Sequence, residues 1–310
     1  MLSFYQYRNN QLVLTENMGE CYIIRAVRAT TDEINQLQNL TQVPVDLLAA
    51  ATDRDERPRI EIDDSCKLLI IRIPHHYDQV QDVPYITIAF GIILTPQHII
   101  TVCSEDSLAW SEMLSGRLRI PEATDRIAFL CSLFMRIARH FLNYLNSIRC
   151  EADNVEKAIH VSMKNEMMIR MLNLEKCLVY FTTSLRANEP IWDRFTRMHG
   201  RELTEAEQEM IDDVRIEFRQ ARDLADIHSN ILSGMMDAFA SIISNNLNVV
   251  IKVLTSVTII LMLPTLLASI YGMNVELPFQ HSPHAFAITM IASIILSIAG
   301  VVIFWKMRWF

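Results

Sequence analysis

Two long segments without a charged residue lie near the C-terminal end of the chain. Val253–Tyr271 is 19 residues long and Ala285–Trp305 is 21 residues long, and neither contains Asp, Glu, Lys or Arg. A helix needs about 20 apolar residues to cross the hydrocarbon core of a bilayer, and buried helices of soluble proteins rarely reach this length without a charge. The sequence therefore predicts two transmembrane helices, over residues 253–271 and 285–305.

The residues that flank these segments indicate their orientation. Lys252 precedes the first segment, Lys306 and Arg308 follow the second, and the connection 272–284 contains no Lys or Arg. Basic residues concentrate on the cytoplasmic side of membrane proteins. We therefore expect a multi-pass protein of the cell (inner or plasma) membrane with both termini in the cytoplasm.

The remainder of the chain is acidic. Residues 251–310 hold three of the 28 Lys and Arg residues and one of the 36 Asp and Glu residues, which leaves 25 cations against 35 anions on residues 1–250. Nucleic-acid binding usually requires a basic surface, so we expect no nucleic-acid partner. The six cysteines include no CxxC pair, and we expect them to be reduced thiols.

Hydrophobic patterning predicts an α+β fold. A cytoplasmic α/β domain is expected over residues 1–120, with strands at 11–15, 21–27, 59–62, 66–73, 85–94 and 98–102 and helices at 31–40 and 43–52. Helical patterns from 121 to about 164 and from about 166 to 195 predict a long helical hairpin over 121–203. A cytoplasmic stalk helix over 204–252 and a transmembrane domain over 253–310 complete the chain.

The stalk segment has a start signal and a heptad repeat. Thr204 and Glu207 form a capping-box pattern at its beginning. Its seam positions alternate steps of four and three residues, as in a coiled coil: Val214, Phe218, Ala221, Ala225, His228, Leu232, Met235, Phe239, Ile242 and Asn246. The simplest partner for so long a seam is another copy of the same helix. His228 and Asn246 are polar residues of this seam. They either fix the register in which the helices pair or take part in the function of the protein.

One face of the stalk end and the first span carries polar and flexible side chains at steps of three and four residues. These residues, the polar stripe, are Asn248, Ile251, Thr255, Thr258, Met262, Thr265 and Ser269. Hydroxyl residues either line a pore or mediate close packing of membrane helices, and both interpretations are open. A pore without carboxylates could not strip water from a small divalent cation, but its neutral oxygen atoms could hydrogen-bond the water shell. As a pore lining, the stripe suits a hydrated cation.

The end of the first span resembles the signature of a known family. Tyr271 is followed by Gly272-Met273-Asn274, and a Gly-Met-Asn triplet at the end of the penultimate span is characteristic of CorA-type magnesium transporters. The segments SNNLNVVIKVLT, LMLPT, LEKCLVYFTTSLRAN and DRDERPRIEI are also similar to that family. The resemblance thus extends over essentially the whole chain.

This resemblance implies a homopentamer in the lipid bilayer, in which the first spans line a pore, the second spans face lipid and the stalk helices form a cytoplasmic funnel. It implies passive, potential-driven uptake of Mg²⁺, with Co²⁺ and Ni²⁺ as further candidate ions. It also implies a selectivity filter of Gly272, Met273 and Asn274, supported by Tyr271. The pore-lining positions that it implies, to which Ser269 on the same face is added, are Asn248, Ile251, Thr258, Met262 and Thr265.

The family is regulated by cytoplasmic Mg²⁺ bound between neighbouring subunits, and Asp213 matches one such position in register with the triplet. Asp78 and Asp82 are candidate partners on the next subunit on chemical grounds alone. The alternative interpretation of all three aspartates is that each is an ordinary solvated charge on the surface. In the outer loop, Glu276 is the single acidic residue that could attract cations.

Three other functions are compatible with parts of the sequence. His281 and His284 in the outer loop suggest a zinc transporter of the ZntB type, although the intact Gly-Met-Asn triplet argues against that branch. A membrane-anchored enzyme could use His75, His76 and Asp78 as metal ligands, but these residues lack the helical i, i+4 spacing and a companion base, and we expect no enzymatic activity. A coiled-coil membrane anchor would oligomerise without ion flux.

Overall fold

The chain forms two compact units, Met1–Gly234 and Met235–Phe310. The computed structural model describes residues 1–8, 11–16, 21–77, 83–115, 125–161, 165–199, 203–275, 277–278, 283–307 and 309. A mixed sheet and most of the helices belong to the first unit, and the apolar C-terminal helices belong to the second.

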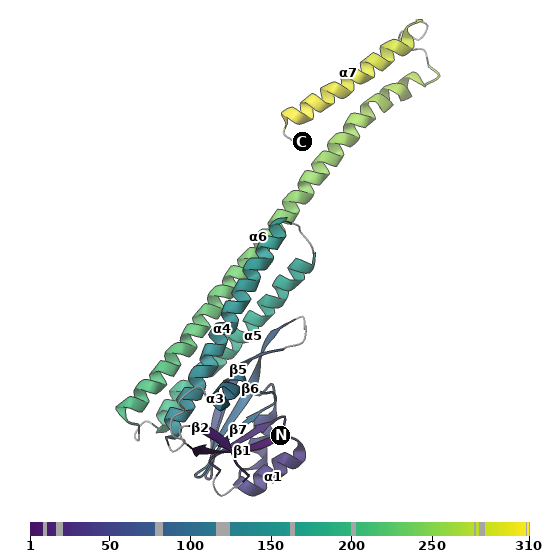
Figure 1. Cartoon of the computed structure of the whole chain (residues 1–310). Helices are drawn as coiled ribbons and strands as arrows, with labels where there is room; N and C mark the ends of the chain where they lie inside the picture. The colour runs from purple at the N-terminus through teal and green to yellow at the C-terminus, as the bar shows by residue number, and fades with distance from the viewer. Residues whose placement is uncertain are drawn as a thin grey trace. The chain divides into compact units, whose positions relative to one another are not determined.

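The described part of the first unit contains a seven-stranded sheet (Figure 1). Its strands are β1 (Leu2–Arg8), β2 (Gln11–Leu14), β3 (Ile23–Val27), β4 (Arg59–Ile62), β5 (Lys67–His76), β6 (Tyr85–Leu94) and β7 (Ile99–Cys103). They lie in the order β2-β1-β3-β7-β6-β5-β4, and only β3 and β7 run parallel. The sheet is therefore mixed, with one parallel pair among antiparallel ladders, and with its helices it forms the mixed strand-and-helix domain expected from the sequence.

Strand β1 is absent from the sequence-based prediction, whereas the other six strands overlap predicted segments. Its buried residues are Ser3 and Tyr5, and Phe4 between them is only half-buried. The apolar alternation that marks a strand is consequently weak in this segment. Antiparallel ladders with β2 and β3 hold β1 in the sheet.

The helices are α1 (Thr31–Thr41), α2 (Val45–Thr52), α3 (Leu108–Leu114), α4 (Arg126–Val161), α5 (Asn165–His199), α6 (Glu205–Tyr271) and α7 (Ala285–Lys306). Helix α3 is short and was not predicted. Helix α6 begins with the predicted capping box: the Thr204 N–H donates to Glu207 Oε2 at 2.7 Å, and the Glu207 N–H donates to Thr204 Oγ1 at 3.3 Å. The predicted start of the helical hairpin at Pro121 lies outside the described residues.

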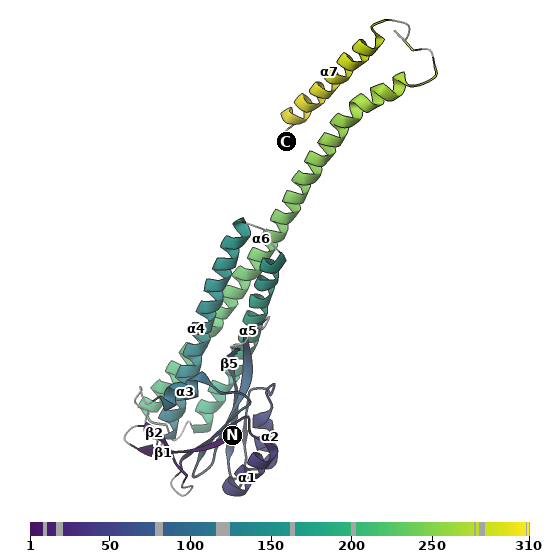
Figure 2. The same ribbon diagram turned by 45° about the vertical axis from the view of Figure 1, so that its right-hand side comes forward.

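Figures 1 and 2 both show the sheet lying between the α1–α2 pair and the longer helices α4, α5 and α6. An apolar core between α1, α2 and the sheet includes Leu37, Leu48, Leu68 and Ile93. Helix α2 comes so close to β6 that a Cβ on Gly91 would lie 2.5 Å from the Ala51 Cβ. This contact requires glycine.

Aromatic residues connect the sheet to the helices on the other side. The rings of Tyr85 on β6 and Tyr144 on α4 have centroids 5.1 Å apart. Tyr85 also meets Phe181 on α5 edge to face, with ring centroids 6.4 Å apart. Large aromatic contacts of this kind contribute much of the burial in a helix–sheet interface, so α4 and α5 are firmly attached to the sheet.

The first half of the α6 seam packs against its own chain, where the prediction expected another copy of the helix. Phe218 contacts Trp192 of α5, with ring centroids 4.6 Å apart, and Phe141 of α4 at 6.3 Å. The buried seam residues of this part are Val214, Phe218, Ala221, Ala225 and Leu232. The α4–α5 hairpin supplies the apolar surface that the seam needs. From Ile242 onward the seam residues are exposed within the chain.

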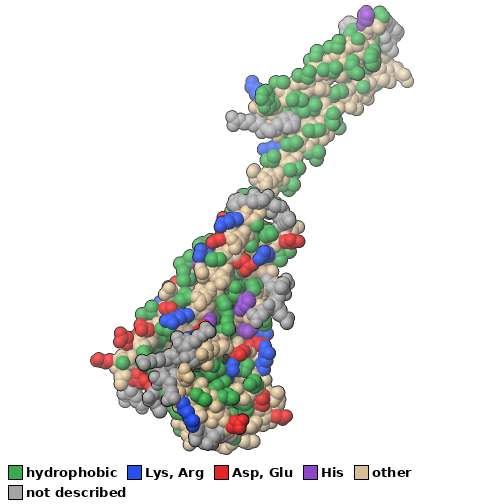
Figure 3. Space-filling model, in the orientation of Figure 1, with side chains coloured by type: hydrophobic (Ala, Val, Ile, Leu, Met, Phe, Trp, Pro, Cys, Tyr) green, Lys and Arg blue, Asp and Glu red, His purple; other side chains and the backbone are tan. Residues whose placement is uncertain are grey.

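The second unit contains the C-terminal part of α6 and all of α7. Both helices have an 18-residue window apolar enough to cross a membrane, with mean hydropathy 2.2 in α6 and 2.6 in α7. Only 6% and 11% of these windows are buried, so neither is the core helix of a soluble fold. Figure 3 shows hydrophobic side chains covering this pair of helices, while charged side chains gather on the first unit.

Candidate functional site

The polar stripe lies on the side of α6 that faces away from α7. The α7-facing side is marked by Ser256, which is fully buried, and by Ile260 and Leu263, the nearest neighbours of Gly300 on α7. Successive residues of a helix are about 100° apart, which places Thr258, Met262 and Thr265 opposite these contacts. The residues of the stripe are all exposed within the chain: Asn248, Ile251, Thr255, Thr258, Met262, Thr265 and Ser269. The stripe is thus not the surface on which α7 of the same chain packs.

The threonine hydroxyls of the stripe have a defined orientation. Thr258 Oγ1 donates to the Leu254 carbonyl oxygen at 2.8 Å, and Thr265 Oγ1 donates to the Leu261 carbonyl oxygen at 3.0 Å. Because each hydroxyl proton is used inside the helix, the oxygen lone pairs remain free to accept hydrogen bonds. The water molecules around a cation direct their protons outward. The stripe can therefore accept hydrogen bonds from a hydrated cation.

The Gly-Met-Asn triplet follows directly on the end of α6. The Gly272 N–H donates to the Ala268 carbonyl at 3.0 Å, which continues the helical bonding by one residue. Tyr271 Oη donates to the Pro278 carbonyl at 3.3 Å and so connects the helix end to the outer loop. Met273 and Asn274 are exposed. Glu276 lies outside the described residues.

Gly272 does not have a left-handed φ. Its backbone freedom is therefore not the reason for glycine at this position, contrary to the usual role of glycine after a helix. A Cβ there would lie 3.3 Å from the Ala268 carbonyl oxygen and 3.5 Å from that of Ser269. The close approach to the last turn of α6 is what disfavours a side chain.

Asp213 is an exposed residue of α6 in the first unit. Its predicted partners, Asp78 and Asp82, lie outside the described residues. Within the described ranges, no group of three or more His, Cys, Asp or Glu side chains is arranged to hold a metal ion. A metal site that includes Asp213 would need ligands from beyond the described part of this chain.

His75 and His76 lie at the end of β5 and line a cavity of about 510 Å³. Burial lowers the pKa of His75, and the nearby Glu105 carboxylate opposes this shift. Glu105 also lines the cavity and forms an ion pair with Arg28. The third residue of the enzyme hypothesis, Asp78, lies outside the described residues. The cavity therefore brings the two histidines together with an ion pair, and the described side chains around it are not arranged to hold a metal ion.

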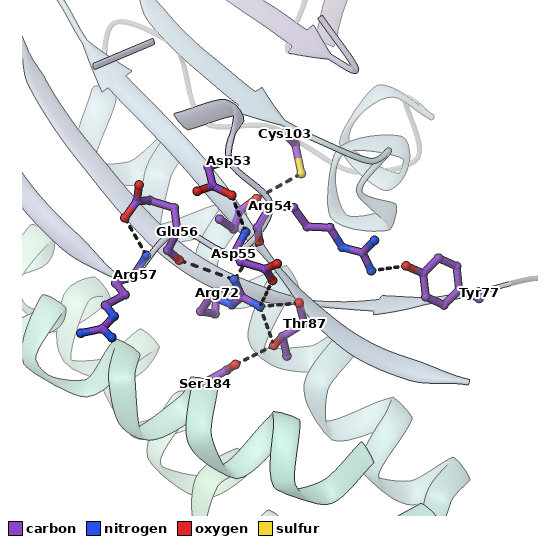
Figure 4. Close-up of polar contacts among 11 residues, drawn as sticks. Asp53, Arg54, Asp55, Glu56, Arg57, Arg72, Tyr77, Thr87, Cys103 and Ser184 are labelled. Carbon is purple, nitrogen blue, oxygen red and sulfur yellow. Dashed lines mark hydrogen bonds and ion pairs between the residues drawn. The ribbon is translucent and has the colours of Figure 1, made fainter. Parts of the chain in front are cut away.

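A half-buried polar network around Arg72 was not anticipated from the sequence (Figure 4). The Arg72 guanidinium donates to the carbonyl oxygens of Thr87 at 2.6 Å and of Arg54 at 2.8 Å. Burial lowers the pKa of Arg72. The Asp55 carboxylate lies 3.8 Å from the guanidinium and opposes this shift. In the sequence, this network is indicated only by the charged run DRDER at 53–57. The folded chain shows that this run lies around Arg72.

Two C-terminal helices with the length and hydropathy of membrane spans, one of which carries a polar stripe, define a membrane protein of the two-span type. The chain belongs to the family of CorA-like Mg²⁺ transporter proteins, whose model matches residues 19–307. This confirms the family indicated by the sequence.

Individual relatives agree with this assignment. The cobalt/magnesium transport protein CorA of Methanocaldococcus jannaschii is 27% identical over 288 residues, which are 90% of this chain and 88% of the relative. The complete structure of the CorA magnesium transporter from the same organism has a TM-score of 0.87 at 24% identity, with 100% of this chain and 99% of that chain covered. The cytoplasmic domain of ZntB from Vibrio parahaemolyticus has a TM-score of 0.62 at 11% identity and covers 78% of this chain and 98% of its own. These similarities to solved structures show the fold.

Proposed function

We propose that this protein is a homopentameric channel that carries hydrated Mg²⁺ passively into the cytoplasm, with Co²⁺ and Ni²⁺ as further substrates. The observation that carries the proposal is the polar stripe of α6, which is exposed within the chain and faces away from α7. Membership of the CorA-like family and the relative described as a cobalt/magnesium transport protein support the choice of ions. Five copies of the stripe around an axis would form a continuous lining.

In this proposal, the ion is selected with its water shell intact. Gly272, Met273 and Asn274 form the outer filter, in which the Asn274 amide oxygen accepts hydrogen bonds from the bound waters. Tyr271 supports the filter through its bond to the Pro278 carbonyl. Mg²⁺ gives up its waters reluctantly. Recognition through acceptors that bind these waters therefore costs less free energy than recognition through ligands that replace them.

Below the filter, Thr265, Thr258 and Asn248 would accept hydrogen bonds from the passing water shell. Ile251 and Met262 would form the hydrophobic constrictions of the pore. Glu276 would attract cations to the outer mouth, and α7 would face lipid. Ser269 completes the lining near the filter.

The membrane potential is sufficient to drive inward movement. Each elementary charge gains about 2.3 kcal/mol per 100 mV, so a divalent ion gains roughly 4.6 kcal/mol. Lys252 and Lys306 flank the two spans and support an orientation in the cell membrane with both ends in the cytoplasm.

Cytoplasmic Mg²⁺ is proposed to close the channel. The excess of 35 anions over 25 cations on residues 1–250 creates repulsion between neighbouring copies. Mg²⁺ bound between Asp213 and the next subunit, with Asp78 or Asp82 as partner, would relieve it and favour a symmetric closed state.

The test is Mg²⁺ entry into liposomes that contain the purified full chain. Asn274→Ala should abolish entry, while Val275→Ala, a change at the neighbouring exposed position, should leave it within about twofold of the unchanged protein. A mass measurement in detergent should give a pentamer for all three proteins. Entry at the normal rate with Asn274→Ala would refute the filter, and a monomer or dimer would refute the channel.

The same assay separates the ion preferences. The fold is shared with a ZntB cytoplasmic domain and does not discriminate between ions. Mg²⁺ should compete with Co²⁺ and Ni²⁺ for entry, whereas preferential entry of Zn²⁺ would favour the zinc transporter. Pentamers without any ion entry would favour the coiled-coil anchor.

A further inference from the structure

Lys252 and Lys306 lie at the same end of the two spanning helices. Gly300 of α7 lies against Ile260 and Leu263 of α6, and Figures 1 and 2 show that α7 runs back along α6. At 1.5 Å per residue, Lys306 lies about 9 Å beyond Gly300, and Lys252 lies about 12–16 Å before the residues that contact this glycine. The levels of the two lysines along the helix pair therefore differ by only about one turn.

Lys252 lies on the side of α6 that faces α7. Ser256, four residues further along, is fully buried, and its Oγ donates to the Lys252 carbonyl oxygen at 2.7 Å. Residues four apart are neighbours on one side of a helix, so Lys252 lies one turn before this buried contact. The Lys252 residue itself is exposed within the chain. Its ammonium group can therefore reach the space beside the C-terminal end of α7.

Among the described residues of the second unit, neither lysine has an acidic partner. Asp237 is the single acidic residue in that part of the unit, and it lies 15 positions before Lys252 on the same helix. This separation is about 22 Å along the helix axis, which is far beyond the reach of an ion pair. The described part of the unit therefore brings two positive charges to one boundary of the spans without a nearby counter-charge.

A tryptophan next to Lys306 adds an aromatic ring to this surface. Trp305 is 73% exposed. The chain then turns back on itself, because the Trp309 N–H donates to the Phe304 carbonyl oxygen at 3.1 Å and the two rings have centroids 5.4 Å apart. Tryptophan is enriched where lipid headgroups meet the acyl chains, because its ring is apolar and its N–H is polar. The end of α7 thus presents an indole ring and an ammonium group side by side.

We propose that Lys252, Lys306 and Trp305 bind one anionic phospholipid in the leaflet at this end of the spans. The lipid phosphate lies between the two ammonium groups, and the acyl chains extend along the exposed apolar side of α7, which includes Ile298 and Val302. Basic residues between membrane helices bind anionic headgroups in this way. A zwitterionic phospholipid carries its own positive group and gains less from the two lysines. The inference requires only the two spans and does not depend on the proposed ion transport.

The experiment uses native mass spectrometry of the purified full chain from mixed micelles of phosphatidylglycerol and phosphatidylcholine with identical acyl chains. We expect one retained phosphatidylglycerol per chain, and Lys252→Gln and Lys306→Gln should each lower its binding constant about fivefold. Lys176→Gln removes an exposed lysine of α5 in the first unit and should change this constant less than about twofold. Trp305→Ala should weaken the binding of both lipids alike and leave the preference between them in place.

Three results would overturn the proposal. Equal retention of the two lipids by the unchanged protein would show that there is no anionic lipid site. Retention of two phosphatidylglycerol molecules per chain, one of which is lost with each lysine, would show separate contacts rather than one shared site. Displacement of the lipid by inorganic phosphate at the same concentration would show a site for free phosphate.

A labelling experiment on the unchanged protein does not depend on the folding of a variant. Lysines react with an acylating reagent in micelles that contain either phosphatidylglycerol or phosphatidylcholine, and the modified peptides are quantified by mass spectrometry. Phosphatidylglycerol should slow the modification of Lys252 and Lys306 together and leave that of Lys176 unchanged. Equal rates in the two lipids at Lys252 and Lys306, or equal protection of Lys176, would contradict the shared site.

Discussion

Gly300 of α7 lies directly against Ile260 of α6: a Cβ on the glycine would be 3.4 Å from Ile260 Cγ1 and 3.5 Å from Leu263 Cδ1. Close approach of this kind is how helices pack in a membrane, where water does not drive apolar association. The contact determines which side of α6 faces α7, and the polar stripe occupies the other side.

Substitution of Gly300 should therefore have a graded effect on transport. Gly300→Ala places its methyl group at ordinary contact distance and should leave Mg²⁺ entry within about twofold. Gly300→Leu cannot fit beside Ile260 and should lower entry at least about tenfold, which corresponds to about 1.4 kcal/mol. Entry assays with both variants, after size-exclusion chromatography of each, provide the check. Equal entry by Gly300→Leu and the unchanged protein would show that this contact does not orient the pore helix.

Asp213→Ala should weaken inhibition by internal Mg²⁺. Removal of one proposed ligand should raise the half-inhibiting concentration more than about twofold, which is roughly 0.4 kcal/mol of coupling. Asp237→Ala removes the same charge from another exposed position of α6 and serves as the control. If both variants behave like the unchanged protein in liposome entry assays, Asp213 is an ordinary solvated acid.

Cys150 should be the single cysteine that reacts rapidly with a thiol reagent in the folded chain. The other five cysteines are buried, and burial raises the pKa of Cys103 and Cys131 to about 12 and that of Cys177 to about 11. The thiolate is the reactive species, so these groups should remain unmodified at pH 8. Mass spectrometry should find one adduct per native chain and six after denaturation. Rapid modification of more than one thiol would contradict the packing of the first unit.

The stability of the protein should decrease as the pH falls below about 6.5. Burial lowers the pKa of His140, whose Nε2 lies 3.3 Å from Glu112 Oε1, and burial shifts His75, His98 and His228 in the same direction. Between the lowered folded pKa and the unfolded value of about 6.5, the unfolded chain binds more protons, so acidification favours unfolding.

Thermal denaturation of the full chain in detergent at pH 7.5 and 5.5 measures this effect. His140→Gln should reduce the difference in melting temperature between pH 7.5 and pH 5.5. The reduction should be about 2–4 °C for each kcal/mol of pH-dependent unfolding free energy that the substitution removes. A melting temperature that rises on acidification would contradict the prediction.

Local patterns in the sequence determined much of this protein. The length and lack of charge of residues 253–271 and 285–305 were sufficient to predict two spans, because a bilayer requires a particular length of apolar helix. The start of α6 could be predicted from Thr204 and Glu207, because a capping box involves only neighbouring residues. The family could be predicted from the Gly-Met-Asn triplet and the segments around it.

Only the tertiary structure decided which surfaces meet. The repeat that begins at Val214 predicted a partner for α6, but Phe218 packs against Trp192 of the same chain because the α4–α5 hairpin lies within reach. The apolar pattern of a helix records that a face is buried and does not identify what covers it. The two hydrogen bonds between the Asn188 side chain on α5 and the Arg72 backbone on β5 join residues that are 116 positions apart in the sequence. Such contacts have no local signal, because they form only when distant elements have already been brought together.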